Sequence, residues 1–124
     1  MSNIDTIKYL IKLFEAMKVD ELLIYFTDDA EYCFANYPAA IGKEVIEATI
    51  KASPLGQIKP IAFNIEYIQG KDDVVICELE VSYTRPDGSA LTLPCLDVFR
   101  MAGDKIRSMR VYMDPSPLLA PSAV

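Results

Sequence analysis

The sequence contains no histidine. Histidine is the commonest general base and the commonest zinc ligand in proteins, so its absence removes the most usual acid–base and metal chemistry. Acid–base chemistry in this chain must therefore come from aspartate, glutamate, tyrosine, lysine or a bound water. The sequence also has no cluster of metal ligands and no glycine-rich phosphate loop, so we expect neither a metal ion nor an organic cofactor.

Cysteine is scarce and occurs only as Cys33, Cys77 and Cys95. The number is odd, the spacing is wide and no CxxC pair occurs, which argues against a disulfide framework and against a zinc site. Buried free thiols are the better interpretation. Because free thiols persist in a reducing compartment, we expect the protein to be cytoplasmic.

Basic runs and long apolar runs are missing as well. Lysine and arginine total 12 against 18 acidic residues, which gives a net charge of −6. Phosphate binding needs clustered positive charge, so we expect no nucleic-acid partner. No apolar run approaches the roughly 20 residues that span a bilayer. Asp5 and Glu15 interrupt the N-terminal segment, which does not resemble a signal peptide, and we expect no membrane partner.

Apolar residues are abundant and make up 52% of the 124 positions. A chain of this length forms one domain and buries roughly two thirds of the surface that its unfolded form exposes. We expect that domain over residues 1–114, followed by a C-terminal tail rich in proline and serine over residues 115–124. Part of the apolar surface is free to line a cavity or a subunit interface.

Hydrophobic periodicity predicts three helices and five strands. The helices are expected over residues 3–18, 21–26 and 42–52. A short strand is expected over residues 30–37, and a meander of four strands over residues 58–69, 74–83, 90–101 and 105–113. Early helices and a late meander predict an α+β fold, with three helices packed on one face of a curved, mostly antiparallel sheet.

An aspartate stands in the middle of an apolar row in the third strand of the meander. Side chains alternate along a strand, so five residues share one face, namely Leu93, Cys95, Asp97, Phe99 and Met101. A buried carboxyl without partners is costly, and such a group is usually neutral, paired or functional. The row therefore indicates a pocket with Asp97 in its wall. The alternative is a carboxyl satisfied by hydrogen bonds or by Arg110 on the adjacent strand.

Three segments give the chain a family resemblance. They are YFTDDAEYCFANYPAAIGKEVIEA over residues 25–48, LDVFRMAGDKI over residues 96–106 and MRVYMD over residues 109–114. They resemble the nuclear transport factor 2-like superfamily, which includes ketosteroid isomerases, limonene-epoxide hydrolases and SnoaL-like polyketide cyclases. The resemblance implies a cone-shaped (cystatin-like) fold, in which a bent sheet wraps around helices and encloses an apolar pocket. It also implies a homodimer formed through the open sheet face, with alternating valine and isoleucine residues of the late strands in the interface.

The resemblance assigns roles to single residues and not to a whole catalytic set. Asp97 matches the protonated acid in the oxyanion hole of ketosteroid isomerases, a carboxyl that an apolar site keeps neutral. The position of the isomerase's general base falls on Phe34, and Tyr9 is the nearest match to the oxyanion tyrosine of the first helix. An isomerase mechanism in the family's known form is therefore not expected.

Asp114 resembles the acid that epoxide hydrolases and some cyclases place at the end of the last strand. Tyr32 lies where the hydrolase has a water-holding tyrosine, and the partner asparagine falls on Phe34, with Asn36 close by. Asp114 also stands before a proline, as in an ordinary strand exit where the acid caps a turn. If Met113 points into the pocket, a regular strand turns Asp114 away, and a bulge is needed to bring both inward.

The leading hypothesis is a small acid–base enzyme of isomerase, cyclase or epoxide-hydrolase type. It would act on an apolar carbonyl or epoxide compound in an internal pocket, with Asp97 and Asp114 as catalytic residues. The residues expected to contact the ligand are Tyr9, Phe14, Tyr32, Phe34, Asn36, Phe99 and Met113. Two alternatives are a non-catalytic module that binds a small apolar molecule and a dimerising scaffold with a filled interior.

Overall fold

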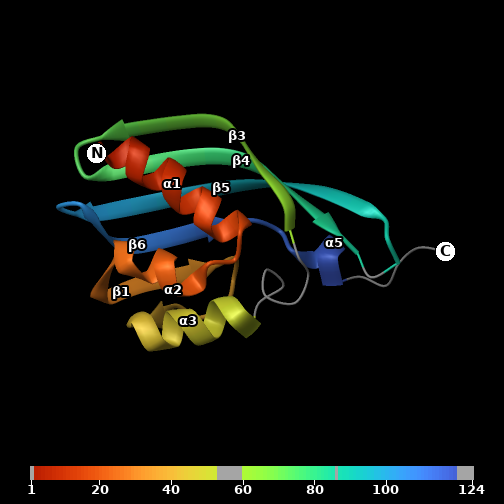
Figure 1. The fold of residues 1–124 in the computed structure, drawn as a ribbon, viewed down its shortest axis with the longest axis horizontal. Coiled ribbons are helices and arrows are strands. Elements are labelled where there is room, and N and C mark those ends of the chain that lie inside the picture. The colour runs from red at the N-terminus through yellow and green to blue at the C-terminus, as the bar shows by residue number, and fades with distance from the viewer. Residues whose placement is uncertain (1, 53–59, 86, 120–124) are drawn as a thin grey trace.

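The computed structural model describes residues 2–52, 60–85 and 87–119, and it has the expected α+β architecture (Figure 1). The helical elements are α1 (Asn3–Glu15), α2 (Val19–Leu22), the 3-10 helix η1 (Leu23–Tyr25), α3 (Lys43–Ala52) and α5 (Ser116–Leu119). The strands are β1 (Phe26–Phe34), β2 (Ala40–Ile41), β3 (Pro60–Lys71), β4 (Val74–Thr84), β5 (Ala90–Ala102) and β6 (Lys105–Tyr112).

The strands of the described residues form one six-stranded sheet in the order β2-β1-β6-β5-β4-β3. Neighbouring strands are antiparallel except β1 and β6, which run parallel, so the prediction of a mostly antiparallel sheet is confirmed. The ladder between β5 and β6 ends at the pair Leu96↔Tyr112, whereas the ladder between β5 and β4 continues to Ala90. The part of β5 before Leu96 therefore has β4 as its partner and lacks β6.

Helix α1 supplies the largest helical part of the core. It begins where the Ser2 hydroxyl accepts a hydrogen bond from the Asp5 amide at 3.1 Å. Its apolar stripe packs against β3 and β4, with the buried positions Thr6, Ile7, Leu10, Ile11, Leu13 and Phe14. Each buried large apolar side chain stabilises the fold by about 1.5–3 kcal/mol, so this stripe fixes α1 on the sheet.

Helix α1 ends at Glu15, three residues before the predicted end. Met17 has a positive φ of 53°, and the Lys18 amide donates to the Leu13 carbonyl at 2.9 Å, which is a Schellman-type ending. The Glu15 carboxylate accepts a hydrogen bond from the Phe63 amide at 2.7 Å. The end of α1 is therefore tied to β3.

Two element boundaries differ from the sequence-based expectation. The second helix was predicted over residues 21–26, but the helical turns end at Tyr25 and Phe26 already begins β1. The strand predicted over residues 30–37 therefore starts earlier, and it stops at Phe34 because Ala35 takes a positive φ of 52°. Strand β2 was not predicted, since it has only two residues and depends on pairing with Glu31 and Tyr32.

The four late strands are confirmed within a few residues of their predicted limits. Residues 58 and 59 of the first of them, and residues 120–124 of the expected tail, lie outside the described residues. Strand β6 contains a β-bulge, because Met101 pairs with Ile106 while Arg100 pairs with Ser108. Among the described residues, no helix is long and apolar enough to cross a membrane.

Candidate functional site

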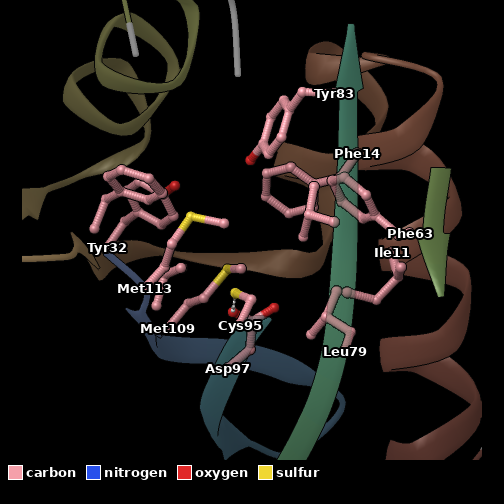
Figure 2. A pocket seen from close by; sticks show the side chains of 13 residues that line it. Ile11, Phe14, Tyr32, Phe63, Leu79, Tyr83, Cys95, Asp97, Met109 and Met113 are labelled. Carbon is pink, nitrogen blue, oxygen red and sulfur yellow. Dashed lines mark hydrogen bonds between the residues drawn. The ribbon is translucent and has the colours of Figure 1, made fainter. Parts of the chain in front are cut away.

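A small cavity lies between α1 and the inner face of the sheet (Figure 2). Its volume is about 20 Å³, which is enough for one water molecule. Every strand from β3 to β6, as well as β1 and α1, contributes to its wall. The lining residues are Ile11, Phe14, Tyr32, Phe34, Phe63, Leu79, Val81, Tyr83, Cys95, Asp97, Met109, Val111 and Met113.

Asp97 is the carboxyl in this wall. It points inward because it alternates with Leu96 and Val98 along β5, and its side chain is only 4% exposed. Burial disfavours the charged form and raises the pKa of Asp97 to about 7, while the Cys95 thiol, which donates to Asp97 Oδ1 at 3.3 Å, opposes that rise. Near neutral pH both protonation states are populated, and such a group can give or accept a proton.

The alternative ion pair between Asp97 and Arg110 is not formed. Asp97 pairs with Val111 across the β5–β6 ladder, whereas Arg110 pairs with Val98. Neighbours along a strand face opposite sides of the sheet, so the exposed Arg110 lies on the outer face. Among the described residues that line the cavity there is no lysine and no arginine, so Asp97 faces no cation there.

Tyr32 contributes a hydroxyl that is buried without a hydrogen-bond partner among the described residues. It pairs with Ala40 and Met109 near the C-terminal end of β1, and Figure 2 shows its hydroxyl on the cavity side of the ring. Burial, followed by the charge of Asp97, raises the pKa of Tyr32, so the hydroxyl keeps its proton. An unpaired buried hydroxyl costs about 1–3 kcal/mol. A water or a ligand oxygen that accepts this proton would remove that cost.

Tyr83 adds a second hydroxyl, which Figure 2 shows pointing into the same space. Its side chain is buried, and burial followed by the nearby Cys95 and Asp97 raises its pKa, so this hydroxyl is also a donor. Tyr83 was not among the site residues predicted from the sequence. The alternation of β4 carries the signal, since Tyr83 shares parity with the buried Leu79 and Val81.

The structure brings five of the nine sequence-predicted site residues together in the cavity wall: Phe14, Tyr32, Phe34, Asp97 and Met113. Four others lie elsewhere. Phe99 is fully buried two residues beyond Asp97 and is not in the wall. Tyr9 is 43% exposed and packs edge-to-face on Tyr25, with ring centroids 5.8 Å apart. Asn36 is exposed beyond the end of β1.

Asp114 is also separate from the cavity. Val111 and Met113 point inward and Tyr112 points outward, so regular alternation turns Asp114 to the outer side, as the parity argument predicted. Asp114 Oδ1 accepts a hydrogen bond from the Ser116 amide at 3.0 Å at the start of α5. This hydrogen bond lowers the pKa of Asp114. Its place in the fold is that of a capping carboxylate.

Metal binding finds no support in the arrangement of side chains. In residues 2–52, 60–85 and 87–119, no group of three or more cysteine, aspartate and glutamate side chains is placed to hold a metal ion. The three cysteines are free thiols. The chemistry that the cavity can offer is therefore proton transfer by one carboxyl and hydrogen bonding by two hydroxyls.

The sequence of this chain matches a known protein family. The family profile of the SnoaL-like domain matches residues 7–109. A search of curated proteins gave no match.

Solved structures share the whole fold at low sequence identity. A protein of the nuclear transport factor 2-like type from Burkholderia pseudomallei K96243 is 14% identical, with a TM-score of 0.82 and coverage of 96% of both chains. The epoxide hydrolase/cyclase-like enzyme SalBIII, with a role in pyran ring formation in the polyether salinomycin, is 16% identical, with a TM-score of 0.79 and coverage of 92% of both chains. A protein with a ketosteroid isomerase-like fold from Catenulispora acidiphila DSM 44928, in complex with trimethylamine, is 20% identical, with a TM-score of 0.75. That match covers 92% of this chain and 88% of the other.

Proposed function

The chain belongs to the SnoaL-like domain family, and on this premise we propose that it is a small, cofactor-independent acid–base enzyme. The reaction is of isomerase, cyclase or epoxide-hydrolase type, and the substrate is an apolar carbonyl or epoxide compound. The observation that carries the proposal is a single buried carboxyl, Asp97, beside two protonated tyrosine hydroxyls in an otherwise apolar cavity. The relation to an epoxide hydrolase/cyclase-like enzyme of the same fold supports it.

For a carbonyl substrate, Asp97 acts as the base in its ionised form. It takes a proton from the carbon next to the carbonyl group. The electron pair of that C–H bond forms a C=C bond to the carbonyl carbon, and the π pair of the carbonyl group moves onto its oxygen. Tyr32 and Tyr83 donate hydrogen bonds to this oxygen as its negative charge develops, which lowers the barrier. The protonated Asp97 then returns the proton to another carbon of the substrate, and the result is an isomer.

For an epoxide substrate, Asp97 acts first as an acid. Its protonated carboxyl gives a proton to the ring oxygen while a water or a hydroxyl group of the substrate attacks one ring carbon and the C–O bond breaks. The attacking oxygen then loses its proton to the Asp97 carboxylate, which restores the starting state. Water as the nucleophile gives a diol, and an internal hydroxyl gives a cyclic ether.

Substrate binding requires that the cavity widen, because about 20 Å³ holds one water and ligand pockets are usually roughly 300–1,000 Å³. Met109 and Met113 are the flexible members of the wall, since methionine is unbranched and has three rotatable side-chain bonds. Phe63 and Met113 are half-buried, so they stand nearest to solvent among the aromatic and methionine side chains of the wall. Movement of these side chains makes room for an apolar substrate.

The experiment that tests the proposal is a screen of apolar ketones and epoxides followed by substitution of Asp97. The Asp97→Asn variant should lose at least about tenfold in rate on any substrate found, since a positioned acid–base group contributes roughly 10²–10⁴-fold. Asp104→Asn, an exposed change in the β5–β6 turn, is the matched control and should keep the parent rate. Equal activity of the Asp97→Asn variant would overturn the role of Asp97.

A non-catalytic binding module is the second candidate. The observation that favours it is that Asp97 is the single carboxyl among the described residues of the wall, whereas many acid–base enzymes use two groups. This candidate predicts that a bound ketone or epoxide is recovered unchanged after long incubation. Conversion of the ligand by the parent protein, and not by the Asp97→Asn variant, would exclude it.

We also propose a second copy of the chain as a partner, on the outer face of the sheet. Each of the four neighbouring strands β3, β4, β5 and β6 exposes one large apolar side chain there. These side chains are Tyr67, Ile76, Leu96 and Tyr112. Exposed apolar patches of this kind mark interaction surfaces. Light scattering at micromolar concentration should give the mass of a dimer, and a monomer would contradict this proposal.

The three free thiols support a cytoplasmic location.

A further inference from the structure

The cavity brings one hydrogen-bond acceptor and two donors to a single small space. Asp97 lies on β5, Tyr32 on β1 and Tyr83 on β4, and Figure 2 shows the three polar groups on different sides of that space. The rest of the described wall is apolar, apart from the Cys95 thiol beside Asp97. These three groups therefore decide which polar atoms a ligand can place in the cavity.

The acceptor is poorly satisfied within the protein. Among the described residues, the one hydrogen bond that the Asp97 carboxyl accepts comes from the Cys95 thiol, at 3.3 Å from Oδ1. A thiol is a weak donor, and no lysine or arginine lines the described part of the wall. Because a buried carboxylate without strong partners is costly, a ligand gains free energy if it brings an N–H or O–H group to Asp97.

The Tyr32 hydroxyl lies near Asp97 without bonding to it. This hydroxyl is buried and forms no hydrogen bond with the described residues. Burial first, and then the charge of Asp97, raise the pKa of Tyr32, and a charge acts in this way over short distances. A ligand group that lies between the two side chains can therefore accept from Tyr32 and donate to Asp97 at the same time.

The size of the cavity limits that group. The volume is about 20 Å³, so the donor and the acceptor of the ligand must be close together in its structure. A carboxamide meets this requirement, since its oxygen accepts and its N–H group donates within one planar unit. A ketone with a hydroxyl on the next carbon offers the same two functions. A simple ketone or an epoxide has acceptors alone and leaves the ionised Asp97 without a new donor.

We infer that the cavity selects carbonyl compounds that carry an N–H or O–H donor beside the carbonyl group, namely carboxamides or α-hydroxy ketones. The carbonyl oxygen lies against the Tyr32 hydroxyl, the donor lies against Asp97, and the apolar remainder packs on the aromatic and methionine side chains of the wall. The inference rests on the proposed function in one respect, namely that a largely apolar compound enters the cavity. It narrows the two proposed substrate classes to one kind of carbonyl compound.

Asp97 is the group of the described wall whose charge changes near neutral pH. Cys77 faces it from β4 as its ladder partner, and burial, followed by the charge of Asp97, raises the pKa of Cys77 to about 12. Burial also raises the pKa values of Tyr32, Tyr83 and Cys95, so these groups keep their protons. Helix α1 and strands β3 and β6 contribute apolar side chains to the wall.

The two kinds of ligand should therefore move the pKa of Asp97 in opposite directions. A ligand that donates to Asp97 favours the carboxylate and should lower the pKa of Asp97 from about 7. A ligand with acceptors alone favours the protonated carboxyl, which can donate to it, and should raise this pKa. A ¹³C NMR titration of the parent protein with each ligand measures the shift without any variant.

The test uses two probes of nearly the same shape, cyclohexanecarboxamide and cyclohexyl methyl ketone, which differ by an NH₂ group in place of a CH₃ group. Cyclohexyl hydroxymethyl ketone is the hydroxyl-bearing probe. The full chain carries ¹³C-methyl methionine, so that Met109 reports entry into the cavity, and the buried Met101, outside the wall, is the internal control. At pH 8 the carboxamide or the hydroxymethyl ketone should bind at least about tenfold more tightly than the methyl ketone.

Three variants test whether this preference comes from Asp97. Asp97→Leu removes the acceptor, so the preference should fall below about threefold, because the N–H or O–H group then loses its partner. Tyr32→Phe removes a donor that all the probes use, so each should bind more weakly while their ratio stays within about threefold of the parent ratio. Asp104→Asn, an exposed change in the β5–β6 turn, should keep the parent affinities.

The outcomes separate the inference from the proposed function. Absence of a Met109 shift with every probe would overturn both, because no such compound would then enter the cavity. Equal affinities of all three probes for the parent protein, or a preference that survives in the Asp97→Leu variant, would overturn the inference alone. A pKa of Asp97 that rises when the carboxamide and the hydroxymethyl ketone bind would also overturn it, and this result does not depend on the folding of any variant.

Discussion

The Cys95 thiol donates a hydrogen bond to Asp97 Oδ1 across 3.3 Å, inside a wall that is otherwise apolar apart from two tyrosine hydroxyls. The two residues are two positions apart on β5, so alternation places them on the same face. The thiol is a weak donor, and burial raises its pKa, so it stays protonated and continues to donate to Asp97. This contact offsets part of the rise in the pKa of Asp97 that burial causes.

Loss of the Cys95 thiol should raise the pKa of Asp97. In the Cys95→Ala variant the stabilised carboxylate loses its one hydrogen-bond donor among the described residues, so the neutral form is favoured more strongly. The Cys95→Ser variant keeps a donor and should bring the pKa of Asp97 back toward or below the parent value. Titration of the carboxyl carbon by ¹³C NMR measures both effects. An unchanged pKa of Asp97 in the Cys95→Ala variant would show that the thiol has no influence.

Stability should depend on pH through Asp97. Burial raises the pKa of this carboxyl from 3.8 to about 7. Between about pH 4 and pH 7 the folded protein therefore binds more protons than the unfolded chain, and the contribution of Asp97 to the free energy of unfolding falls as pH rises through that window.

The Asp97→Asn variant lacks this dependence, because its amide does not ionise. It should be more stable than the parent at pH 8, by on the order of 4 kcal/mol, and more than half of that difference should be gone at pH 5. Urea unfolding of both proteins at the two pH values gives the comparison. An equal difference at pH 5 and pH 8 would contradict the raised pKa of Asp97.

Removal of the Tyr32 hydroxyl should separate stability from activity. The Tyr32→Phe variant loses a buried polar group that has no partner among the described residues, so the free energy of unfolding should stay constant or rise by about 1–3 kcal/mol. The rate on a carbonyl substrate should fall, since removal of one donor to a developing oxyanion costs roughly 10²–10³-fold. Denaturant unfolding and steady-state kinetics on the same preparations measure the two effects. A variant that loses stability would mean that the hydroxyl has a structural partner.

The contact between Glu15 and the Phe63 amide should stabilise the packing of α1 on β3. The Glu15→Ala variant leaves that amide without its charged acceptor, and because the contact is exposed the free energy of unfolding should fall by about 0.5–1.5 kcal/mol. Glu15→Gln keeps an oxygen acceptor and should lose less. Asp104→Ala, a change in an exposed turn, serves as the control in the same unfolding measurement. Equal stability of the Glu15→Ala variant would mean that the contact contributes nothing.

The inward direction of Asp97 was predictable because alternation along one strand is a local property of the sequence. The same parity argument predicted that Met113 and Asp114 would separate, and it would have found Tyr83 if applied to β4. The family resemblance predicted the α+β cone and the wall positions of Tyr32 and Phe34. Local pattern and resemblance together therefore predicted the fold, and five of the nine residues that they indicated for the site lie in the cavity wall.

The rest depends on register between strands, which the sequence does not reveal. Arg110, the alternative partner considered for Asp97, lies on the opposite face because Asp97 pairs with Val111. The β-bulge in β6 brings Ile106 to the buried side with Met109, although strict alternation assigns them opposite faces. Tyr9 fell outside the cavity because its place on α1 lies beyond the buried stripe.

The most direct test of the central claim is the pKa of Asp97 itself. A ¹³C NMR titration of the parent protein, with the Asp97 signal assigned by its absence in the Asp97→Asn variant, gives this value without any knowledge of the substrate. The account predicts a pKa of Asp97 of about 7, which suits proton transfer near neutral pH. A value near 3.8, that of an ordinary solvated carboxyl, would contradict a buried acid poised for catalysis.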